Sequence, residues 1–279
     1  MANVKTIPEG WMETTLGEVV DFVVDNRGKT PPLVNSGYEL LEVNTISDNA
    51  REPNYSKVSK FVDEEIFVSG FRKGTIKKGD VLIPTVGTIG NASYSKQDRG
   101  AIAQNLIALR TNRENDSLFL YYLISGSDTK KALLNLDIGG VQPSIKVPHL
   151  LDMTITSPSL PEQQGIARML SSFDDKIELL CEQNETLEKT AQTIFQEWFG
   201  KYGVDDELPE GWRVRKIGDI ATLKSGYAFK SVDFVQENHK KALKIKDLKG
   251  NGKVDLSDVS SVSNESVSSS RVQYFKLNE

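Results

Sequence analysis

The chain has 279 residues, a net charge of −5, one cysteine and two histidines. This length fits one large domain or two ordinary ones. One cysteine and two histidines exclude an internal disulfide and a His/Cys metal cluster. The sequence has no run of about 18 apolar residues and no apolar signal region at its N-terminus, so we expect a reduced, cytoplasmic protein.

The acidic surplus is concentrated in one segment. Residues 161–207 carry 4 basic and 11 acidic side chains, a net charge of −7, whereas residues 1–160 are at −2 and residues 208–279 at +4. An acidic total argues mildly against nucleic-acid binding. The flanking segments are near neutral or basic, however, so they can still carry a local surface that contacts nucleic acid.

Residues 1–158 combine short helical and strand patterns. Apolar spacing predicts a helix at 15–24 and another at 117–135, broken near Ser125 and Gly126. Short apolar runs predict strands at 39–43, Val81–Pro84, 92–95, 106–110 and 153–156. Polar loops are expected at 26–32, 44–51, 85–90 and 139–144. Because strands and helices follow no regular βαβ order, we predict an α+β domain.

Residues 159–200 predict one long helix with a heptad seam. Ser159 and Glu162 have capping-box spacing, and Gly200 follows the last apolar residues as a helix-ending glycine does. Apolar residues recur at spacings of four and three, and Asn184 fills the one polar seam position. The predicted helix-pairing seam consists of Ile166, Leu170, Phe173, Ile177, Leu180, Asn184, Leu187, Ala191, Ile194 and Trp198.

This narrow, regular seam favours pairing with a second helix, and a polar seam residue commonly fixes the pairing register. About forty residues at about 1.5 Å each make a rod of about 60 Å. The alternative is an ordinary amphipathic helix that lies on its own domain. An unbroken run of heptads is long for that role.

An internal repeat with an offset near 201 residues relates the two ends of the chain. Residues 7–11 (IPEGW) return as 208–212 (LPEGW), and residues 16–19 (LGEV) return as 217–220 (IGDI). Weaker matches join 41–43 to 243–245 and 55–59 to 256–260. By this offset Glu279 corresponds to Lys78, just before a predicted strand. We therefore expect a two-repeat protein with an incomplete second copy.

These motifs resemble those of the specificity subunits of type I restriction–modification enzymes. The resemblance covers the whole chain and rests on PEGW and LGE near the start, KKGDVLIPTVGTIG at 77–90, QNLIAL at 104–109, GGVQPSIK at 139–146 and LPEQQGIARML at 160–170. It implies a first target-recognition domain at 1–158, a helical spacer at 159–200, a linker at 201–207 and the first part of a second recognition domain at 208–279.

The resemblance also implies a division of labour. Each recognition domain reads one half of a split double-stranded DNA site, and paired antiparallel spacers hold two such domains at a fixed separation. Methyltransferase subunits dock on this scaffold, and ATP-driven restriction subunits join them. S-adenosylmethionine, ATP and Mg²⁺ are then expected on those partners and no cofactor on this chain. The open seam further predicts self-association of two copies.

The residues themselves point to a subunit without catalysis. The sequence has no Gly-x4-Gly-Lys-Ser/Thr loop for ATP. It also lacks the Asn/Asp-Pro-Pro-aromatic motif of amino-methyltransferases. Asp174 and Asp175 fall on the predicted long helix, where solvated charges are the simpler interpretation.

Sixteen residues are candidates for DNA contact. Asparagine and arginine can read base edges, basic side chains can neutralise phosphates, and the glycine loop at 85–90 can offer backbone N–H groups to a phosphate. Turn chemistry, a tight strand connection or a solvated surface explain the same residues without DNA. The candidates are Asn44, Thr45, Asn49, Arg51, Arg72, Lys73, Lys77, Lys78, Thr85, Gly87, Thr88, Gly90, Gln104, Asn105, Gln142 and Ser144.

Two functions remain open on these grounds. The first is a DNA-reading specificity subunit that also scaffolds its partners. The second is an assembly protein that pairs through its helix with a full-length specificity subunit and modulates specificity without reading DNA. Sequence-specific DNA binding in the presence of methyltransferase partners separates the two.

Overall fold

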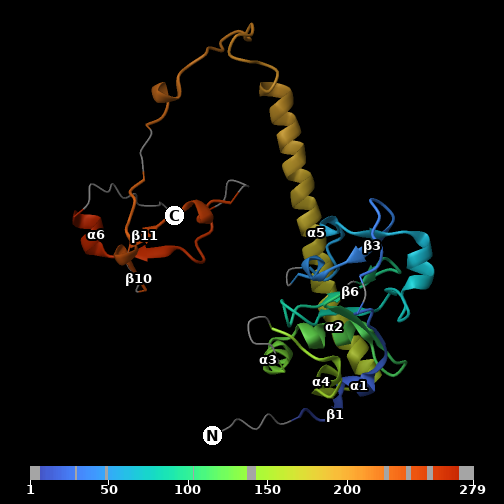
Figure 1. The fold of residues 1–279 in the computed structure, drawn as a ribbon. Coiled ribbons are helices and arrows are strands. Elements are labelled where there is room, and N and C mark those ends of the chain that lie inside the picture. Colours follow the sequence, from blue (N-terminus) through green and yellow to red (C-terminus); the bar gives the residue numbers. More distant parts are fainter. Residues whose placement is uncertain are drawn as a thin grey trace. The chain divides into compact units, whose positions relative to one another are not determined.

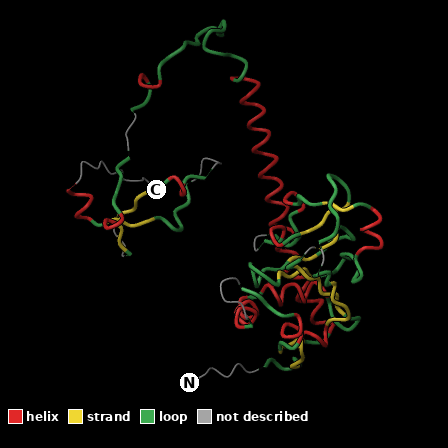
Figure 2. The backbone as a smooth tube through the Cα atoms, in the orientation of Figure 1, coloured by secondary structure: helices red, strands yellow, loops and turns green. Residues whose placement is uncertain are grey.

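The computed structural model describes residues 7–28, 30–47, 50–102, 104–136, 143–222, 226–236, 240–249 and 254–269. The chain divides into two compact units, Met1–Ile194 and Phe195–Glu279, and the division falls inside one long helix. Helices and strands are mixed along the chain (Figures 1 and 2), which confirms the predicted α+β class.

A four-stranded antiparallel sheet forms the centre of the first unit. Its strand order is β2 (Val20–Val24), β8 (Leu106–Thr111), β5 (Val81–Pro84) and β6 (Ser93–Tyr94). Successive side chains of a strand point to opposite faces. In β5, Val81 and Ile83 join the cluster that contains the helices, whereas Leu82 joins a second buried cluster. Both faces are therefore covered, which explains why β5 reads as a continuous apolar run.

Four helices cover one face of this sheet, and each contributes buried side chains to the larger cluster. They are α1 (Leu16–Val19), α2 (Ser117–Ser125), α3 (Ser127–Asn135) and α4 (Val147–Leu151). The predicted break near Ser125 and Gly126 is confirmed, because Gly126 has extended φ and ψ angles between α2 and α3.

Two smaller sheets complete the first unit. Strands β4 (Phe61–Val62), β3 (Tyr38–Leu41) and β7 (Ala101–Ile102) form one in that order, and β1 (Met12–Thr15) pairs with β9 (Thr154–Ser157) in the other. Short 3₁₀ turns occupy Val43–Thr45 and Tyr55–Lys57, and a five-residue π-helical turn occupies Ile66–Gly70. The π-helical turn follows β4 and forms one wall of the cleft described below.

The helix predicted at residues 15–24 is wrong for most of its length. Only Leu16–Val19 is helical, with Thr15 as its N-cap, and Val20–Val24 forms β2. Strand β2 pairs antiparallel with β8, from Val20 opposite Thr111 to Val24 opposite Ala108. The valines of this segment are β-branched and fit a sheet well, so this pairing overrides the helical spacing.

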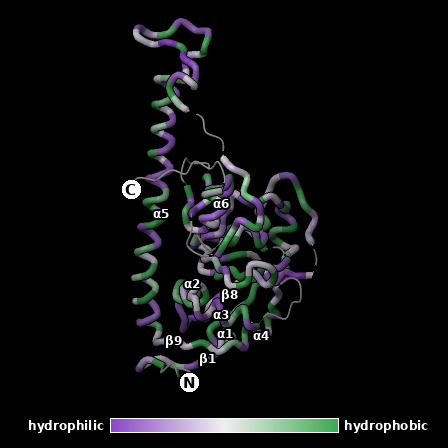
Figure 3. The backbone as a smooth tube through the Cα atoms, turned by 90° about the vertical axis from the view of Figure 1, so that its left-hand side faces the viewer, coloured by the Kyte–Doolittle hydropathy of each residue, from purple (hydrophilic) through white to green (hydrophobic). Residues whose placement is uncertain are grey.

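The predicted long helix is confirmed as α5 (Leu160–Phe199), which begins against the first unit and continues beyond its globular part (Figure 1). From residue 179 to its end, every residue of α5 is exposed. Hydrophobic and hydrophilic residues alternate along it (Figure 3). The seam is exposed too: Phe173 is 62 %, Leu187 66 % and Trp198 67 % exposed.

The second unit repeats several elements of the first. Strand β12 (Ser260–Val262) lies between β10 (Phe234–Val235) and β11 (Lys240–Ala242). The antiparallel pairing of β12 with β11 corresponds to that of β4 with β3 in the first unit. A 3₁₀ turn at Ile245–Asp247 follows β11 as Val43–Thr45 follows β3, and α6 (Asn264–Ser269) follows β12. The offset seen in the sequence thus also relates backbone elements.

Both PEGW segments form the same turn. Gly10 and Gly211 have φ values of 83° and 85°, and each following tryptophan N–H donates to the proline carbonyl, at 3.1 and 3.0 Å. A positive φ at the third position defines a type II turn, which glycine adopts without strain. Among the described helices, none has the length and apolar character that a membrane crossing requires.

Candidate nucleic-acid interface

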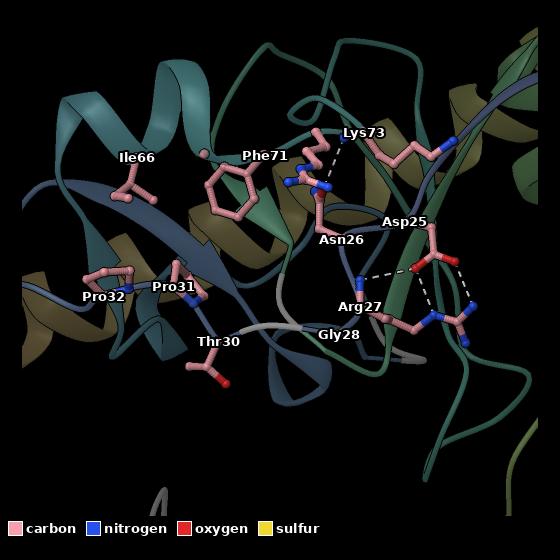
Figure 4. A pocket seen from close by; sticks show the side chains of 12 residues that line it. Asp25, Asn26, Arg27, Gly28, Thr30, Pro31, Pro32, Ile66, Phe71 and Lys73 are labelled. Carbon is pink, nitrogen blue, oxygen red and sulfur yellow. Dashed lines mark hydrogen bonds and ion pairs between the residues drawn. The ribbon is translucent and has the colours of Figure 1, made fainter.

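A cleft of about 610 Å³ opens between the loop that follows β2 and the π-helical turn with the residues after it (Figure 4). Its lining residues, all from the first unit, are Asp25, Asn26, Arg27, Gly28, Thr30, Pro31, Pro32, Ile66, Gly70, Phe71, Arg72 and Lys73. More than thirty residues separate the two segments in the sequence, so the fold itself creates the cleft.

Asn26 joins the two walls of the cleft. Its Nδ2 donates to the carbonyl of Gly74 at 3.0 Å, and its Oδ1 accepts from the backbone N–H of Lys73 at 3.3 Å. One amide side chain thus satisfies a donor and an acceptor of the opposite loop, which fixes the distance between the walls.

Arg27 is held in a defined orientation by its neighbour. Its Nε and Nη2 donate to the two carboxylate oxygens of Asp25 at 2.7 and 2.6 Å, and this pair lowers the pKa of Asp25 below its usual range. Bidentate pairs of this kind restrict the planar guanidinium more than a single hydrogen bond does. The Arg27 side chain is 35 % exposed, so the part of its guanidinium that faces away from Asp25 is accessible to a ligand.

The cleft combines an apolar floor with a basic rim. Phe71 and Ile66 face Pro31 across it (Figure 4), while Arg72 and Lys73 are exposed at its edge. Three cationic side chains and one carboxylate, Asp25, line the described part of the cleft. A surface with three cationic side chains suits a polyanion, and the phosphates of nucleic acid carry that charge.

A smaller cleft of about 160 Å³ adjoins the first and shares Thr30 and Pro31 with it. Gln104 and Asn105 line it, and the Gln104 amide donates to the Thr30 hydroxyl at 3.4 Å. Asn105 has a positive φ of 68° at the tight turn before β8, and it is exposed. The structure therefore brings four of the predicted residues, Arg72, Lys73, Gln104 and Asn105, around the same loop.

Arg51 lies elsewhere, and the structure corrects its predicted role. Its side chain is only 4 % exposed, and its guanidinium pairs with Asp175 and Glu178 of α5. Burial lowers the pKa of this group, but the pairs with the two carboxylates outweigh that effect and raise it above its usual range. A side chain committed in this way cannot reach a base edge.

Thr45 and Thr85 are also misplaced for DNA contact, because each is 1 % exposed. The Thr45 hydroxyl donates to the carbonyl of Glu42 at 2.6 Å. Both belong to the interior of the first unit, and the structure corrects their predicted role as well. Asn44, next to Thr45, is exposed.

The glycine loop at 85–90 uses backbone groups for its own fold. The N–H of Gly87 donates to the carbonyl of Pro143 at 3.0 Å, and residue 86 forms an isolated bridge with Ser144. Gly90 is buried against Lys130, whereas Thr88 is exposed. The Gly87 amide is therefore not free to bind a phosphate, and the tight-connection interpretation fits this loop better.

The remaining candidates divide between a separate surface and segments outside the described residues. Lys77 pairs with Asp98 at 3.0 Å, and the Lys78 N–H donates to the same carboxylate at 2.8 Å. Asn49 and Gln142 lie outside the described residues. Of the four basic residues predicted as one cluster, only Arg72 and Lys73 line the cleft.

The sequence prediction missed Asp25, Asn26 and Arg27. The signal was present in the segment 25–32, where charged and amide side chains precede a glycine and two prolines. Such a segment is a rigid polar loop, and rigid loops commonly carry binding residues. Among the described residues, no group of His, Cys, Asp and Glu forms a metal site.

Comparisons with known proteins agree with the motifs. Residues 8–189 match the family described as type I restriction modification DNA specificity domain, and this chain belongs to that family. Members of this family are specificity subunits, which are distinct from the catalytic subunits of these systems.

Curated relatives are specificity subunits from archaea and bacteria. The MjaIX specificity subunit of Methanocaldococcus jannaschii is 33 % identical over 168 residues, which are 53 % of this chain and 37 % of the relative. The EcoBI specificity subunit of Escherichia coli is 25 % identical over 185 residues, 62 % of this chain and 37 % of the relative. The chain spans between a third and just over half of the length of such relatives.

Solved structures of similar fold include the type I system S subunit from M. genitalium, with a TM-score of 0.47 and 20 % identity over 86 % of this chain and 60 % of that chain. The HsdS subunit from Thermoanaerobacter tengcongensis has the same TM-score at 15 % identity, over 92 % of this chain and 68 % of that chain.

Proposed function

We propose that this chain is a DNA sequence-specificity subunit whose first unit reads one half of a bipartite double-stranded DNA site. The observation that carries the proposal is the cleft of the first unit. It gathers Arg27, Arg72 and Lys73 beside the amides of Gln104 and Asn105. Basic side chains there position the duplex through phosphates, and the amides and Arg27 read base edges.

The proposed partners follow from the family. Methyltransferase subunits dock on this scaffold, restriction subunits join them in the complete enzyme, and S-adenosylmethionine, ATP and Mg²⁺ bind to those partners. The proposed place of action is the cytoplasm. The acidic helix α5 carries none of the cleft residues, which supports a scaffold role for it.

The test is DNA binding by the full chain in complex with a methyltransferase partner of the same system, measured as a function of salt. We expect sequence-specific binding whose affinity falls with salt. The slope of the logarithm of the binding constant against the logarithm of the salt concentration should decrease in magnitude by about 1 for each phosphate contact removed. Arg72→Gln with Lys73→Gln should therefore decrease the magnitude of this slope by about 2. Lys77→Gln with Lys78→Gln is the matched control, because it removes the same charge from the surface near Asp98.

Two results would contradict the proposal. One is the absence of sequence-specific binding by the complex. The other is an equal loss of salt dependence in the Arg72/Lys73 and Lys77/Lys78 variants, since binding would then follow net charge and not the cleft.

The exposed seam favours a second candidate function. Phe173, Ile177 and Leu187 are each more than half exposed, and this surface suits a helix of the same type from a second copy or from a full-length specificity subunit. A chain acting only in this way would pair with a full-length subunit and change its site without DNA contacts of its own. Such a chain would tolerate the Arg72/Lys73 substitutions without any change in the methylated site.

A further inference from the structure

The first five turns of α5 are attached to the recognition domain through polar groups. Gln163, 2 % exposed, accepts from the N–H of Asp116 at 2.8 Å and lies 3.0 Å from the side-chain oxygens of Asn115 and Ser157. Three turns further on, the Tyr122 hydroxyl donates to Asp174 at 2.7 Å.

The next contact along α5 joins a buried arginine of the domain to two carboxylates of the helix. Arg51 donates to Asp175 and to Glu178, the latter at 3.0 Å, with only 4 % of its side chain exposed. Lys96 bridges Glu178 and Glu52 at 2.9 Å each. Beyond this point α5 is exposed on all sides, so Arg51, Asp175 and Glu178 form the last firm attachment, here called the arginine clamp.

Apolar packing contributes less to this attachment than polar contacts do. Ala167 is the one apolar residue that is buried in the described helix α5, at 3 % exposure, and the residues of the three buried apolar clusters all lie outside α5. Apolar contact is non-directional and tolerates rotation of a helix about its axis. Hydrogen bonds and ion pairs depend on direction, so the contacts of Gln163, Tyr122 and Arg51 restrict rotation of α5 in a way that apolar contact does not.

We propose that Arg51 is a positioning residue that sets the direction in which α5 leaves the recognition domain. The helix segment that measures the distance between two DNA half-sites then begins at Glu178 and not at the start of α5. The consequence for half-site spacing rests on the proposed function, whereas the effect on helix direction does not. Residues before Glu178 fix the helix to the domain, and residues after it set the reach.

The geometry shows why direction matters. From Glu178 to Phe199 the helix extends 21 residues, or about 32 Å at about 1.5 Å per residue. A tilt of about 10° at the arginine clamp displaces the helix end by about 5.5 Å. This exceeds the rise of about 3.4 Å between neighbouring base pairs, so a loose clamp blurs the register between two half-sites.

The experiment measures a spin-label distance across the arginine clamp in the full chain. Cys181 is the single cysteine and is exposed, so Cys181→Ser gives a cysteine-free background. Labels at Lys131→Cys on α3 and Gln192→Cys on α5 occupy exposed positions, and Gln192 lies off the seam. Dilution with unlabelled chain removes distances between copies. We expect one narrow distance distribution.

Arg51→Met should broaden this distribution or shift it by about 4 Å, the displacement at Gln192 for a tilt of about 10°. Arg51→Lys keeps the positive charge but loses the planar guanidinium with its paired donors. Its distance distribution should therefore be intermediate in width between those of wild type and Arg51→Met. Arg99→Met is the matched control, because Arg99 pairs with Glu39 on the domain and not with α5. An unchanged distribution in folded Arg51→Met would overturn the proposal.

A second variant decides the matter if Arg51→Met does not fold. Asp175→Asn with Glu178→Gln changes only the helix side of the arginine clamp and leaves every residue of the apolar clusters in place. This variant should broaden the distribution as well, and a wild-type distribution would overturn the proposal. With a methyltransferase partner, the same variant should methylate sites of more than one spacing. If the wild-type complex methylates no specific site, the proposed function fails while the distance result still tests the clamp.

Discussion

Asp80 offers the sharpest test of how the first unit is held together. It belongs to the KGDVLI motif and is fully buried at the start of β5. Its two carboxylate oxygens accept from Nε and Nη2 of Arg110 at 2.8 Å each, and one of them accepts from the Lys77 N–H at 2.8 Å. The motif that marks the family in the sequence is thus an internal structural pair.

The expected effect of Asp80→Asn follows from these contacts. The asparagine side chain has the same shape as the aspartate. Its NH₂ group, however, then faces an N–H donor of Arg110 or Lys77, so at least one charge-assisted hydrogen bond is lost. Breaking a fully buried pair costs about 3–5 kcal/mol. Because the Arg110 side chain is 35 % exposed, water replaces part of the loss, and we expect a destabilisation of about 3 kcal/mol.

Hydrogen exchange of peptides that span β5 and β8 measures this loss in the first unit alone. A loss of about 3 kcal/mol corresponds to exchange about 100-fold faster where exchange requires unfolding of the unit. Asp98→Asn, which removes an exposed carboxylate from the same lysine, is the control and should leave these peptides unchanged. Equal protection in Asp80→Asn and wild type would refute the reasoning.

Three further predictions concern α5 and its contacts. Leu187→Glu should reduce self-association in sedimentation at micromolar concentration, whereas Gln192→Glu, which adds the same charge off the seam, should not; a monomeric wild-type chain would contradict this. Trp11→Phe removes the indole hydrogen bond to Glu162 at 3.0 Å, and exchange of the first α5 turn should rise while β5 stays protected. Arg51 lowers the pKa of Asp175 below its usual range, so this ion pair should persist at neutral pH and be lost as the pH falls through that lowered pKa. The spin-label distance should therefore be the same at pH 8 and pH 6 and broaden only in stronger acid. Broadening already at pH 6 would show that another group controls the clamp.

Features that depend on local sequence were predictable. The long helix was predicted from apolar residues at spacings of three and four, and this pattern lies entirely within the segment itself. Strand β5 follows from the run Val81–Pro84 and its preceding turn. The helix at 15–24 failed because a short segment with valines satisfies both periods, and only β8, about ninety residues later, decides between them.

The candidate site depended on contacts that no local pattern contains. Asn26 joins Gly74 across 48 positions, and Gln104 reaches Thr30 across 74. Arg51 was the clearest failure. Its residue type suits base reading, but its partners on α5 lie more than 120 positions away. Residue chemistry alone could not separate an arginine that reads DNA from one that holds a helix.

Helix α5 can be clamped and paired at the same time because the two functions use different faces. Asp174 and Glu178, which contact the recognition domain, each follow a seam residue, Phe173 and Ile177, by one position. One position is about 100° around a helix of 3.6 residues per turn. A partner helix on the seam therefore need not displace the domain. A change in the arginine clamp should then alter direction without abolishing pairing, whereas a change in the seam should abolish pairing without altering direction.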